Sequence, residues 1–389
     1  MKIGIEGQRL FRQKKHGMDF VALELVKNIQ LEDQENEYFI FVKPGPDKCL
    51  HSSANVHIIE LPGKSYPWWE QIALPRAVKK YGCEILHCTS NTGPVICPVP
   101  LIVTVHDIFY LEVVSLFKKG FSAYQKFGNM YRRYVVPIVV KHSRKIITVS
   151  LSEKKRIASF FKIYDNRLTV VYNGVSDIFQ PVTDPHELQR VREVYKLPGR
   201  FIFLLGNTDP KKNTRGVILA YATYRAKCKT DIPLLIADFP ENTLNAILTE
   251  NNCTGIRSDI LRLDYIKNTD LPAIYSMSDQ FLYPSFWESF GIPILEAMSC
   301  GTPVITSNVF SMPEIAGDAA LLVDPNNPDE IAQAIIRLSS EPGLKNQLIS
   351  KGIVQAKKFS WNKMALDVMK LYREILTSPG QPTDYHRDD

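Results

Sequence analysis

The sequence predicts an α/β fold made of two doubly wound, Rossmann-like domains, each built on a parallel sheet. The chain has 389 residues, of which 45% are hydrophobic and 23% charged, and these fractions exclude a disordered or fibrous protein. At roughly 100–200 residues per domain, this length favours two domains of similar size. Short apolar runs alternate with longer amphipathic stretches, and the series occurs twice, with a break near residues 173–181.

The predicted strands are short runs of apolar and β-branched residues. They lie at residues 3–5, 38–42, 56–59, 85–87, 101–105 and 146–149 in the first half, and at 201–205, 233–236, 280–283, 303–306 and 320–323 in the second. Helical patterns lie between them, as at residues 20–30, 68–81, 152–161 and 214–228. The alternation indicates parallel sheets, because parallel strands are joined by helical crossovers. Such sheets bind ligands beyond the carboxyl ends of their strands, so we expect the domains to face each other across a cleft.

The break in the pattern sets the predicted domain boundaries. We expect one domain at residues 1–178 and a second at residues 179–360. A further helix at residues 361–378 either caps the second domain or crosses back onto the first. The remaining residues, 379–389, are polar, and we expect them to be a disordered tail.

The sequence lacks the motifs of several common kinds of catalytic and cofactor-binding site. It contains no GxxxxGK[ST] loop, no GxGxxG after the first strand, no GxSxG elbow and no HExxH pair. It also contains no compact DxD element of the kind that holds a divalent cation beside a sugar nucleotide. We therefore expect no metal site and no bound cofactor.

Cysteine spacing and hydropathy bear on the cellular compartment. The seven cysteines form no CxxC pair, and they are interpreted as reduced thiols of a cytoplasmic protein. No run approaches the roughly eighteen apolar residues that span a bilayer, and the N-terminus is interpreted as a strand rather than a signal peptide.

The net charge of +6 is unevenly distributed along the chain. No acidic residue occurs between Glu112 and Glu153, and residues 113–152 mix lysine and arginine with phenylalanine and tyrosine. The plainest interpretation is a solvated helix face whose aromatic residues belong to the core. The functional alternative is peripheral contact with the inner, anionic surface of a membrane. Nucleic acid fits least, and we expect no nucleic-acid partner.

The most informative segment is residues 284–304, PSFWESFGIPILEAMSCGTPV. A strand leads into a loop with Gly291, and a short helix is predicted to start near Pro293 and to end before Gly301. Free N–H groups at the start of such a helix suit an anion such as pyrophosphate. Glu288 in the loop and Glu296 in the first turn of the helix flank this point, and carboxylates accept hydrogen bonds from sugar hydroxyls. Taken alone, the two glutamates would also fit a solvated loop residue and a helix cap or core ion pair.

This segment resembles the signature of the retaining glycosyltransferases of family 4, which have the GT-B architecture. Four more segments resemble family elements in family order: residues 104–108 (TVHDI), 171–175 (VYNGV), 206–213 (GNTDPKKN) and 311–320 (SMPEIAGDAA). Together these elements span roughly residues 1–330. The resemblance implies an N-terminal domain that binds the acceptor and a C-terminal domain that binds the nucleotide sugar.

The resemblance also implies roles for individual residues. Glu296 would bind the donor ribose, and Glu288 would contact the donor sugar where positive charge develops. The diphosphate would be held by Lys212 with help from Lys211. Backbone N–H groups of three consecutive residues would face the sugar or phosphate: Phe290, Gly291 and Ile292.

The two remaining roles fall in the N-terminal domain. His106 would lie beside the sugar and the acceptor, and Gly17, in the loop after the first strand, would approach the distal phosphate. The sequence departs from the family at two points. Asn207, which would also belong to the donor-binding set, stands where many relatives have an arginine. Neutralisation of the phosphates would therefore rest on Lys212 with help from Lys211, or from Arg9 or Arg12. The N-terminal loop has a single glycine, Gly17, in place of a Gly–Gly pair.

The function that the resemblance implies is transfer of a hexose, mannose being favoured, from a nucleoside diphosphate sugar with retention of configuration. The acceptor would be a glycan or a lipid-linked glycan in bacterial surface polysaccharide synthesis, such as capsule or O-antigen. Alternatives are a non-catalytic subunit that binds a sugar nucleotide, or another GT-B enzyme such as a sugar-nucleotide epimerase or a phosphorylase. The intact set of Glu288, Glu296 and Lys212 argues against a non-catalytic subunit.

Overall fold

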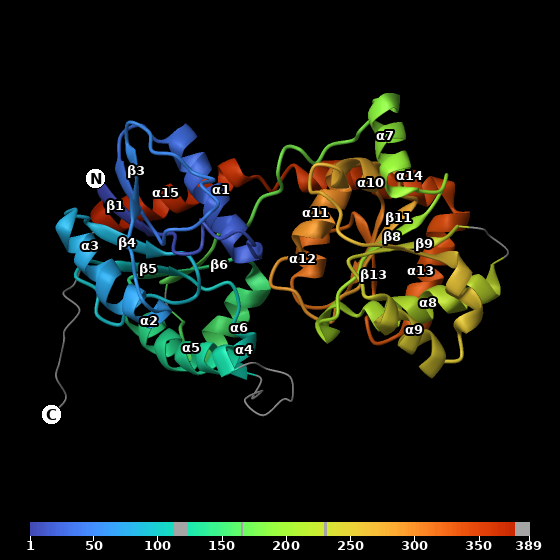
Figure 1. Cartoon of the computed structure of the whole chain (residues 1–389), viewed down its shortest axis with the longest axis horizontal. Helices are drawn as coiled ribbons and strands as arrows, with labels where there is room; N and C mark the ends of the chain where they lie inside the picture. The colour runs from blue at the N-terminus through green and yellow to red at the C-terminus, as the bar shows by residue number, and fades with distance from the viewer. Residues whose placement is uncertain (113–122, 165, 229–231, 378–389) are drawn as a thin grey trace. The chain divides into compact units, whose positions relative to one another are not determined.

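The computed structural model describes residues 1–112, 123–164, 166–228 and 232–377. Two compact units divide the chain: unit 1 comprises Met1–Asn173 together with the segment from Trp361 onward, and unit 2 comprises Gly174–Ser360 (Figure 1). The sequence-based divisions fall after residues 178 and 360. The predicted polar tail, residues 379–389, lies outside the described residues.

Unit 1 contains a seven-stranded, all-parallel sheet with the order β3-β2-β1-β4-β5-β6-β7. Its strands are β1 (Lys2–Glu6), β2 (Glu37–Val42), β3 (Val56–Glu60), β4 (Ile85–Cys88), β5 (Leu101–Thr104), β6 (Lys145–Thr148) and β7 (Leu168–Val170). Its helices are α1 (Gly17–Glu32), α2 (Tyr66–Trp68), the π-helical turn η1 (Trp69–Ala73), α3 (Leu74–Lys80), α4 (Phe109–Glu112), α5 (Ala123–His142), α6 (Leu151–Phe161) and α15 (Trp361–Thr377).

The last helix, α15, is part of unit 1 and packs against α1 (Figure 1). Its buried Tyr372 lies within hydrogen-bonding distance of His87 on β4, with 2.7 Å between the hydroxyl and Nδ1. Another apolar cluster joins α3, α5 and α6 to the sheet through residues such as Val78, Val136 and Ile157. Burial on both faces explains why the strands of this sheet are apolar runs rather than alternating ones.

Unit 2 contains a six-stranded parallel sheet with the order β10-β9-β8-β11-β12-β13. Its strands are β8 (Ile202–Leu205), β9 (Leu234–Ala237), β10 (Ile260–Leu263), β11 (Gln280–Tyr283), β12 (Val304–Ser307) and β13 (Ala320–Val323). Its helices are α7 (Pro185–Tyr195), η2 (Pro210–Lys212), α8 (Thr214–Lys227), α9 (Glu241–Glu250), η3 (Thr254–Asp259), α10 (Leu271–Met277), α11 (Ile292–Ser299), α12 (Met312–Ala316), α13 (Pro328–Ser340) and α14 (Pro342–Ala356).

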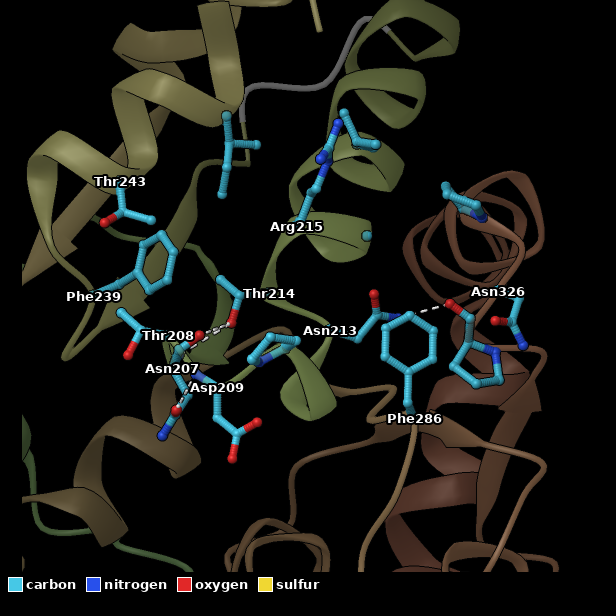
Figure 2. A pocket seen from close by; sticks show the side chains of 16 residues that line it. Asn207, Thr208, Asp209, Asn213, Thr214, Arg215, Phe239, Thr243, Phe286 and Asn326 are labelled. Atoms are coloured by element: carbon cyan, nitrogen blue, oxygen red, sulfur yellow. Dashed lines mark hydrogen bonds between the residues drawn. The ribbon is translucent and has the colours of Figure 1, made fainter. Parts of the chain in front are cut away.

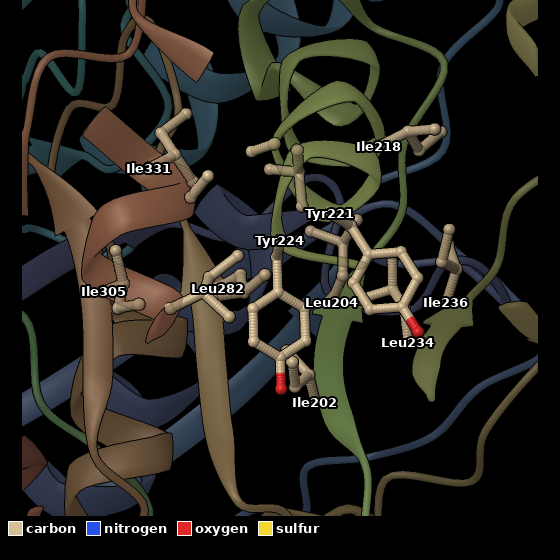
Figure 3. Packing of buried hydrophobic residues seen from close by; sticks show 14 of the residues in the cluster. Ile202, Leu204, Ile218, Tyr221, Tyr224, Leu234, Ile236, Leu282, Ile305 and Ile331 are labelled. Atoms are coloured by element: carbon tan, nitrogen blue, oxygen red, sulfur yellow. The ribbon is translucent and has the colours of Figure 1, made fainter. Parts of the chain in front are cut away.

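The core of unit 2 determines which side chains of β11 pack against helices α8 and α13 and which point to the opposite face of the sheet. Leu282 packs in a cluster with Tyr221 and Tyr224 of α8 and with Ile331 of α13 (Figure 3). Successive side chains of a strand point to opposite faces, so the residues on either side of Leu282 point away from this cluster. Tyr283 accordingly stacks on Phe281 on the other face, with 5.8 Å between ring centroids.

The predicted fold class, two parallel-sheet α/β domains, is confirmed. Two strands were missed, β7 and β10, and both are edge strands of their sheets. Edge strands carry polar residues that interrupt the apolar pattern, as Arg262 does in β10. The helix predicted at residues 68–81 is divided into α2, η1 and α3, with Pro75 at the start of α3, because proline cannot donate the hydrogen bond that a continuous helix requires.

Candidate active site

Lys212 ends η2, a short turn that follows β8. Asp209 caps this turn, accepting a hydrogen bond from the Lys211 N–H at 3.1 Å. Asn213 follows with a left-handed backbone (φ 56°), and its buried side chain donates to the carbonyls of Pro284 (2.9 Å) and Pro325 (2.8 Å). Asn213 thereby ties the lysine-bearing turn to the loop after β11.

Lys212 and Glu288 form an ion pair, with 2.6 Å between Nζ and Oε1. Tyr283 joins the pair, since its hydroxyl lies 3.0 Å from Lys212 Nζ and 2.9 Å from Glu288 Oε1. The side chains of Lys212 and Glu288 are 23% and 11% exposed. Burial raises the pKa of Tyr283 well above its ordinary value, so the phenol stays protonated beside the two charges.

The loop that carries Glu288 is fixed by its backbone. The Ser311 hydroxyl, fully buried, lies within hydrogen-bonding distance of the carbonyls of Glu288 (2.8 Å) and Phe290 (3.0 Å). The Phe286 N–H donates to the Lys211 carbonyl at 2.7 Å. Both ends of the loop are therefore attached to neighbouring elements of unit 2.

Helix α11 begins directly after this loop. Gly291 is its N-cap with φ 102°, a conformation that side-chain-bearing residues rarely adopt, and no side chain caps the helix. The N–H of Ile292 is therefore left for another hydrogen-bond acceptor, whereas Pro293 has no N–H and the Ile294 N–H donates to the Gly291 carbonyl at 3.0 Å. Phe290 is buried with its ring against Phe359, 5.8 Å between centroids, so only its backbone can serve a ligand.

Glu296 is the fifth residue of α11, and the expectation that it lies in the first turn is wrong because the helix begins at Ile292. Its Oε2 accepts a hydrogen bond from Tyr275 of α10 at 3.2 Å. Burial raises the pKa of Glu296 to about 7, although the Tyr275 hydrogen bond opposes the shift. This carboxyl therefore changes charge near neutral pH.

Two predicted donor-binding residues have other partners in this structure. Asn207 folds its side chain onto the local backbone, where Oδ1 accepts from the Asp209 N–H at 2.8 Å. Asn207 also lines a pocket of about 490 Å³ beside the start of α8, between the rings of Phe239 and Phe286 (Figure 2). None of the other nine predicted site residues lines this pocket. Lys211 Nζ lies 5.2 Å from the centre of the Trp287 ring.

Unit 1 holds the two predicted residues of the N-terminal domain. His106 follows β5 and is buried, with Nε2 2.9 Å from the Thr89 carbonyl. Because a carbonyl only accepts, Nε2 carries the hydrogen and Nδ1 is left as an acceptor. Burial lowers the pKa of His106 to about 4, so the ring is neutral at physiological pH. Gly17 is the first residue of α1 rather than a loop residue, with open space where a Cβ would stand.

The arginines expected to assist Lys212 also have partners within unit 1. The Arg9 guanidinium lies 5.5 Å from the centre of the Tyr66 ring. Arg12 lies 3.6 Å from the buried carboxylate of Asp19.

Sequence reasoning missed three residues that position this site: Tyr275, Tyr283 and Ser311. Tyr283 directly precedes the PSFWESFG segment, and Ser311 opens the SMPEIAGDAA segment. Tyr283 therefore lay next to a recognised motif and Ser311 within one, and the alternation along β11 could have assigned Tyr283 to the face opposite Leu282.

The arrangement in unit 2 combines the Lys212 ammonium, the uncapped N–H of Ile292 and the carboxylates of Glu288 and Glu296. A lysine beside helix N–H groups suits a diphosphate, and carboxylates nearby suit sugar hydroxyls. Within the part of the chain that the structure describes, no three or more His, Cys, Asp or Glu side chains gather as metal ligands would.

Two parallel-sheet α/β units, with this site at the carboxyl ends of the strands of unit 2, correspond to the GT-B architecture of glycosyltransferases. Two family models match the chain: Glycosyltransferase Family 4 over residues 17–177, and Glycosyl transferases group 1 over residues 187–355. The chain belongs to the family 4 glycosyltransferases, as its sequence motifs predicted.

Known proteins similar to this chain include O-antigen chain mannosyltransferase B of Escherichia coli, 33% identical over 233 residues. That match covers 59% of this chain and spans 61% of the relative's length, less than two thirds. A glycosyltransferase from Rickettsia africae has a similar structure, with a TM-score of 0.73, 20% identity, and coverage of 97% of this chain and 99% of that one. Anabaena Alr3699/HepE, solved in complex with UDP and glucose, has a TM-score of 0.70 and 16% identity, with 96% and 99% covered.

Hydropathy gives one further finding. None of the helices in the described ranges is both long enough and apolar enough to span a bilayer.

Proposed function

We propose that this protein transfers a hexose from a nucleoside diphosphate sugar to a glycan or lipid-linked glycan, with retention of configuration. The observation that carries the proposal is the Lys212–Glu288 pair at the start of α11, with Glu296 one turn into the same helix. The resemblance of the sequence to the family signature supports a role for these residues in binding the donor. Similarity to an O-antigen mannosyltransferase favours mannose as the sugar, and a structural neighbour solved with UDP and glucose supports a nucleotide-sugar donor.

The proposed chemistry depends on stabilising the departing diphosphate. Lys212 and the Ile292 N–H at the start of α11 would receive the negative charge that grows as the sugar–phosphate bond lengthens. Glu288 would face the oxocarbenium-like sugar, where positive charge grows. The acceptor hydroxyl would attack on the face that the diphosphate leaves and would give its proton to the departing phosphate oxygen. Neutral His106 would contribute its free Nδ1 as a hydrogen-bond acceptor for a hydroxyl group.

No metal takes part in this proposal. Lysine and helix N–H groups supply the positive field that a divalent cation supplies in other sugar-nucleotide enzymes.

The experiment has a binding arm and a turnover arm. In the binding arm, GDP-, UDP-, ADP- and dTDP-sugars are screened by thermal shift, where a ligand at about 100 times its dissociation constant stabilises by roughly 2.7 kcal/mol. In the turnover arm, release of nucleoside diphosphate is measured with and without mannose-containing oligosaccharide acceptors. Acceptor-dependent release supports the proposal, and NMR of the product gives its anomeric configuration. Donor binding without release contradicts it and indicates a sugar-nucleotide-binding subunit.

Peripheral contact with an anionic membrane is the second part of the proposal. Phe127, Met130 and Tyr134 of α5 are 49%, 57% and 71% exposed, and their spacing of three and four residues aligns them on one helix face. The predicted basic and aromatic interval, residues 113–152, contains this face, although residues 113–122 lie outside the described part. Cosedimentation with phosphatidylglycerol vesicles, but not with phosphatidylcholine vesicles, is expected at low salt and should weaken as salt is raised. Equal cosedimentation with both kinds of vesicle would contradict the proposed electrostatic attraction to an anionic membrane.

A further inference from the structure

The hydroxyl of Tyr283 is placed between the two charged groups of the candidate site. It lies 3.0 Å from Lys212 Nζ and 2.9 Å from Glu288 Oε1, and the side chain is buried. An ammonium group can only donate hydrogen bonds and a carboxylate can only accept them. The direction of both bonds is therefore fixed: Lys212 donates to the phenol oxygen, and the phenol donates its single hydrogen to Glu288.

The ring of Tyr283 is held as firmly as its hydroxyl. It stacks on Phe281 with 22° between ring planes, and the Lys212 ammonium lies 5.2 Å from the ring centre. Strand β11 sets the direction of the Tyr283 side chain, because the preceding residue, Leu282, packs in the core on the opposite face of the sheet. The phenol therefore approaches the pair from a rigid element, whereas Glu288 lies on a loop.

Among the described residues, the Glu288 carboxylate has two partners, Lys212 and Tyr283. A donor diphosphate placed at the start of α11 would compete with Glu288 for the Lys212 ammonium. Once Lys212 turns to the diphosphate, the hydrogen bond from Tyr283 is the contact that keeps the Glu288 carboxylate in position. This step rests on the proposed function, since it assumes that Lys212 binds the donor.

We propose that Tyr283 is a positioning residue of the transferase site, holding the Glu288 carboxylate toward the donor sugar while Lys212 binds the diphosphate. It acts through Glu288, so its removal should affect the reacting complex more than donor binding. Hydrogen bonds to charged groups are among the stronger ones in proteins. Tyr283→Phe should therefore lower the turnover number roughly 10- to 100-fold and leave the donor KM within about threefold.

Tyr221→Phe is the matched control. Tyr221 is also a buried tyrosine of unit 2, and its hydroxyl donates to the Ile232 carbonyl at 3.0 Å, in the core cluster around α8 (Figure 3). Losing that hydroxyl should lower the melting temperature without lowering turnover. A comparable loss of turnover in both variants would overturn the proposal, because it would show that any lost buried hydroxyl has this effect.

The deciding test is a double-mutant cycle of turnover numbers. If Tyr283 acts through Glu288, Tyr283→Phe combined with Glu288→Ala, which removes the acceptor of the Tyr283 hydrogen bond, should be no slower than Glu288→Ala alone. Effects that multiply, or a Tyr283→Phe variant with wild-type turnover, would overturn the role of Tyr283 while leaving the proposed function intact. If wild-type protein itself transferred no sugar from any nucleotide donor, the proposed function would fail, and this role with it.

Discussion

The affinity for the donor is expected to depend on pH through Glu296. Its carboxyl accepts a hydrogen bond from Tyr275, and burial raises its pKa to about 7. An ionised carboxylate can accept hydrogen bonds from both hydroxyls of a ribose, whereas the protonated form gives up part of that capacity. Affinity should therefore be gained as pH rises through 7 and lost as it falls.

The size of the effect follows from the titration curve. A group with a pKa of about 7 is ionised to about one tenth at pH 6 and about nine tenths at pH 8. If the ionised form is the one that binds, the donor dissociation constant should fall about tenfold over this range, or about 1.4 kcal/mol. The free energy of unfolding of the protein without donor should change in the opposite direction. Because the pKa of Glu296 is higher in the folded state than in the unfolded state, its contribution to stability is lost as pH rises from the unfolded-state pKa through 7.

The other titratable groups that face Glu296 do not contribute to the pH dependence of donor affinity between pH 6 and 8. Burial raises the pKa of Tyr275 and Tyr283 well above 10, and that of Cys300 to about 12. None of the three titrates between pH 6 and 8.

Isothermal titration calorimetry with an intact nucleotide sugar is the assay. Free nucleoside diphosphate is avoided because its terminal phosphate titrates near pH 6. The profile of Glu296→Gln should be flat between pH 6 and 8. A flat profile in the wild type, or the same slope in the variant, would refute the assignment of Glu296 to the ribose.

Three further predictions concern the same site. Lys212→Ala should lower turnover roughly 100- to 1,000-fold, as loss of a preorganised charge stabiliser does, and a loss below about threefold in a folded variant would contradict its role. Glu288→Gln should mainly lower the turnover number. Glu296→Gln should mainly raise the donor KM, because the ribose contact is equally strong in ground and transition states. If steady-state kinetics show the opposite effects, the roles assigned to the two glutamates are the wrong way round. Turnover should persist in EDTA, and complete loss that magnesium or manganese restores would show that a metal is required.

The sequence predicted the fold because both sheets are buried on two faces, which makes their strands recognisable as continuous apolar runs. It failed at the sheet edges, where β7 has only three residues and β10 carries Arg262. The apolar periodicity of residues 68–81 also predicted one continuous helix. It does not show the π-helical turn that precedes Pro75 and divides this segment.

The family motifs, rather than residue type alone, indicated which residues of the candidate site belong together. Lys212 and Glu288 are 76 residues apart in sequence, and the structure brings them into contact. The supporting tyrosines were not predictable from motifs, because a buried tyrosine in an apolar run looks like a core residue until its hydroxyl partner is known. Asn207 was expected at the donor because it stands where many relatives have an arginine, yet its short side chain accepts a hydrogen bond within its own turn.

The return of α15 to unit 1 has a consequence for biosynthesis. The chain enters unit 2 at Gly174 and leaves it at Ser360, and Val175 and Ser360 form a bridge side by side. Unit 2 is thus an insertion within unit 1, whose last helix is synthesised only after the whole insertion has been translated. Until then, α1 lacks its partner helix and His87 lacks Tyr372. A nascent or truncated chain ending near residue 360 would expose an apolar face, which makes it a substrate for chaperones.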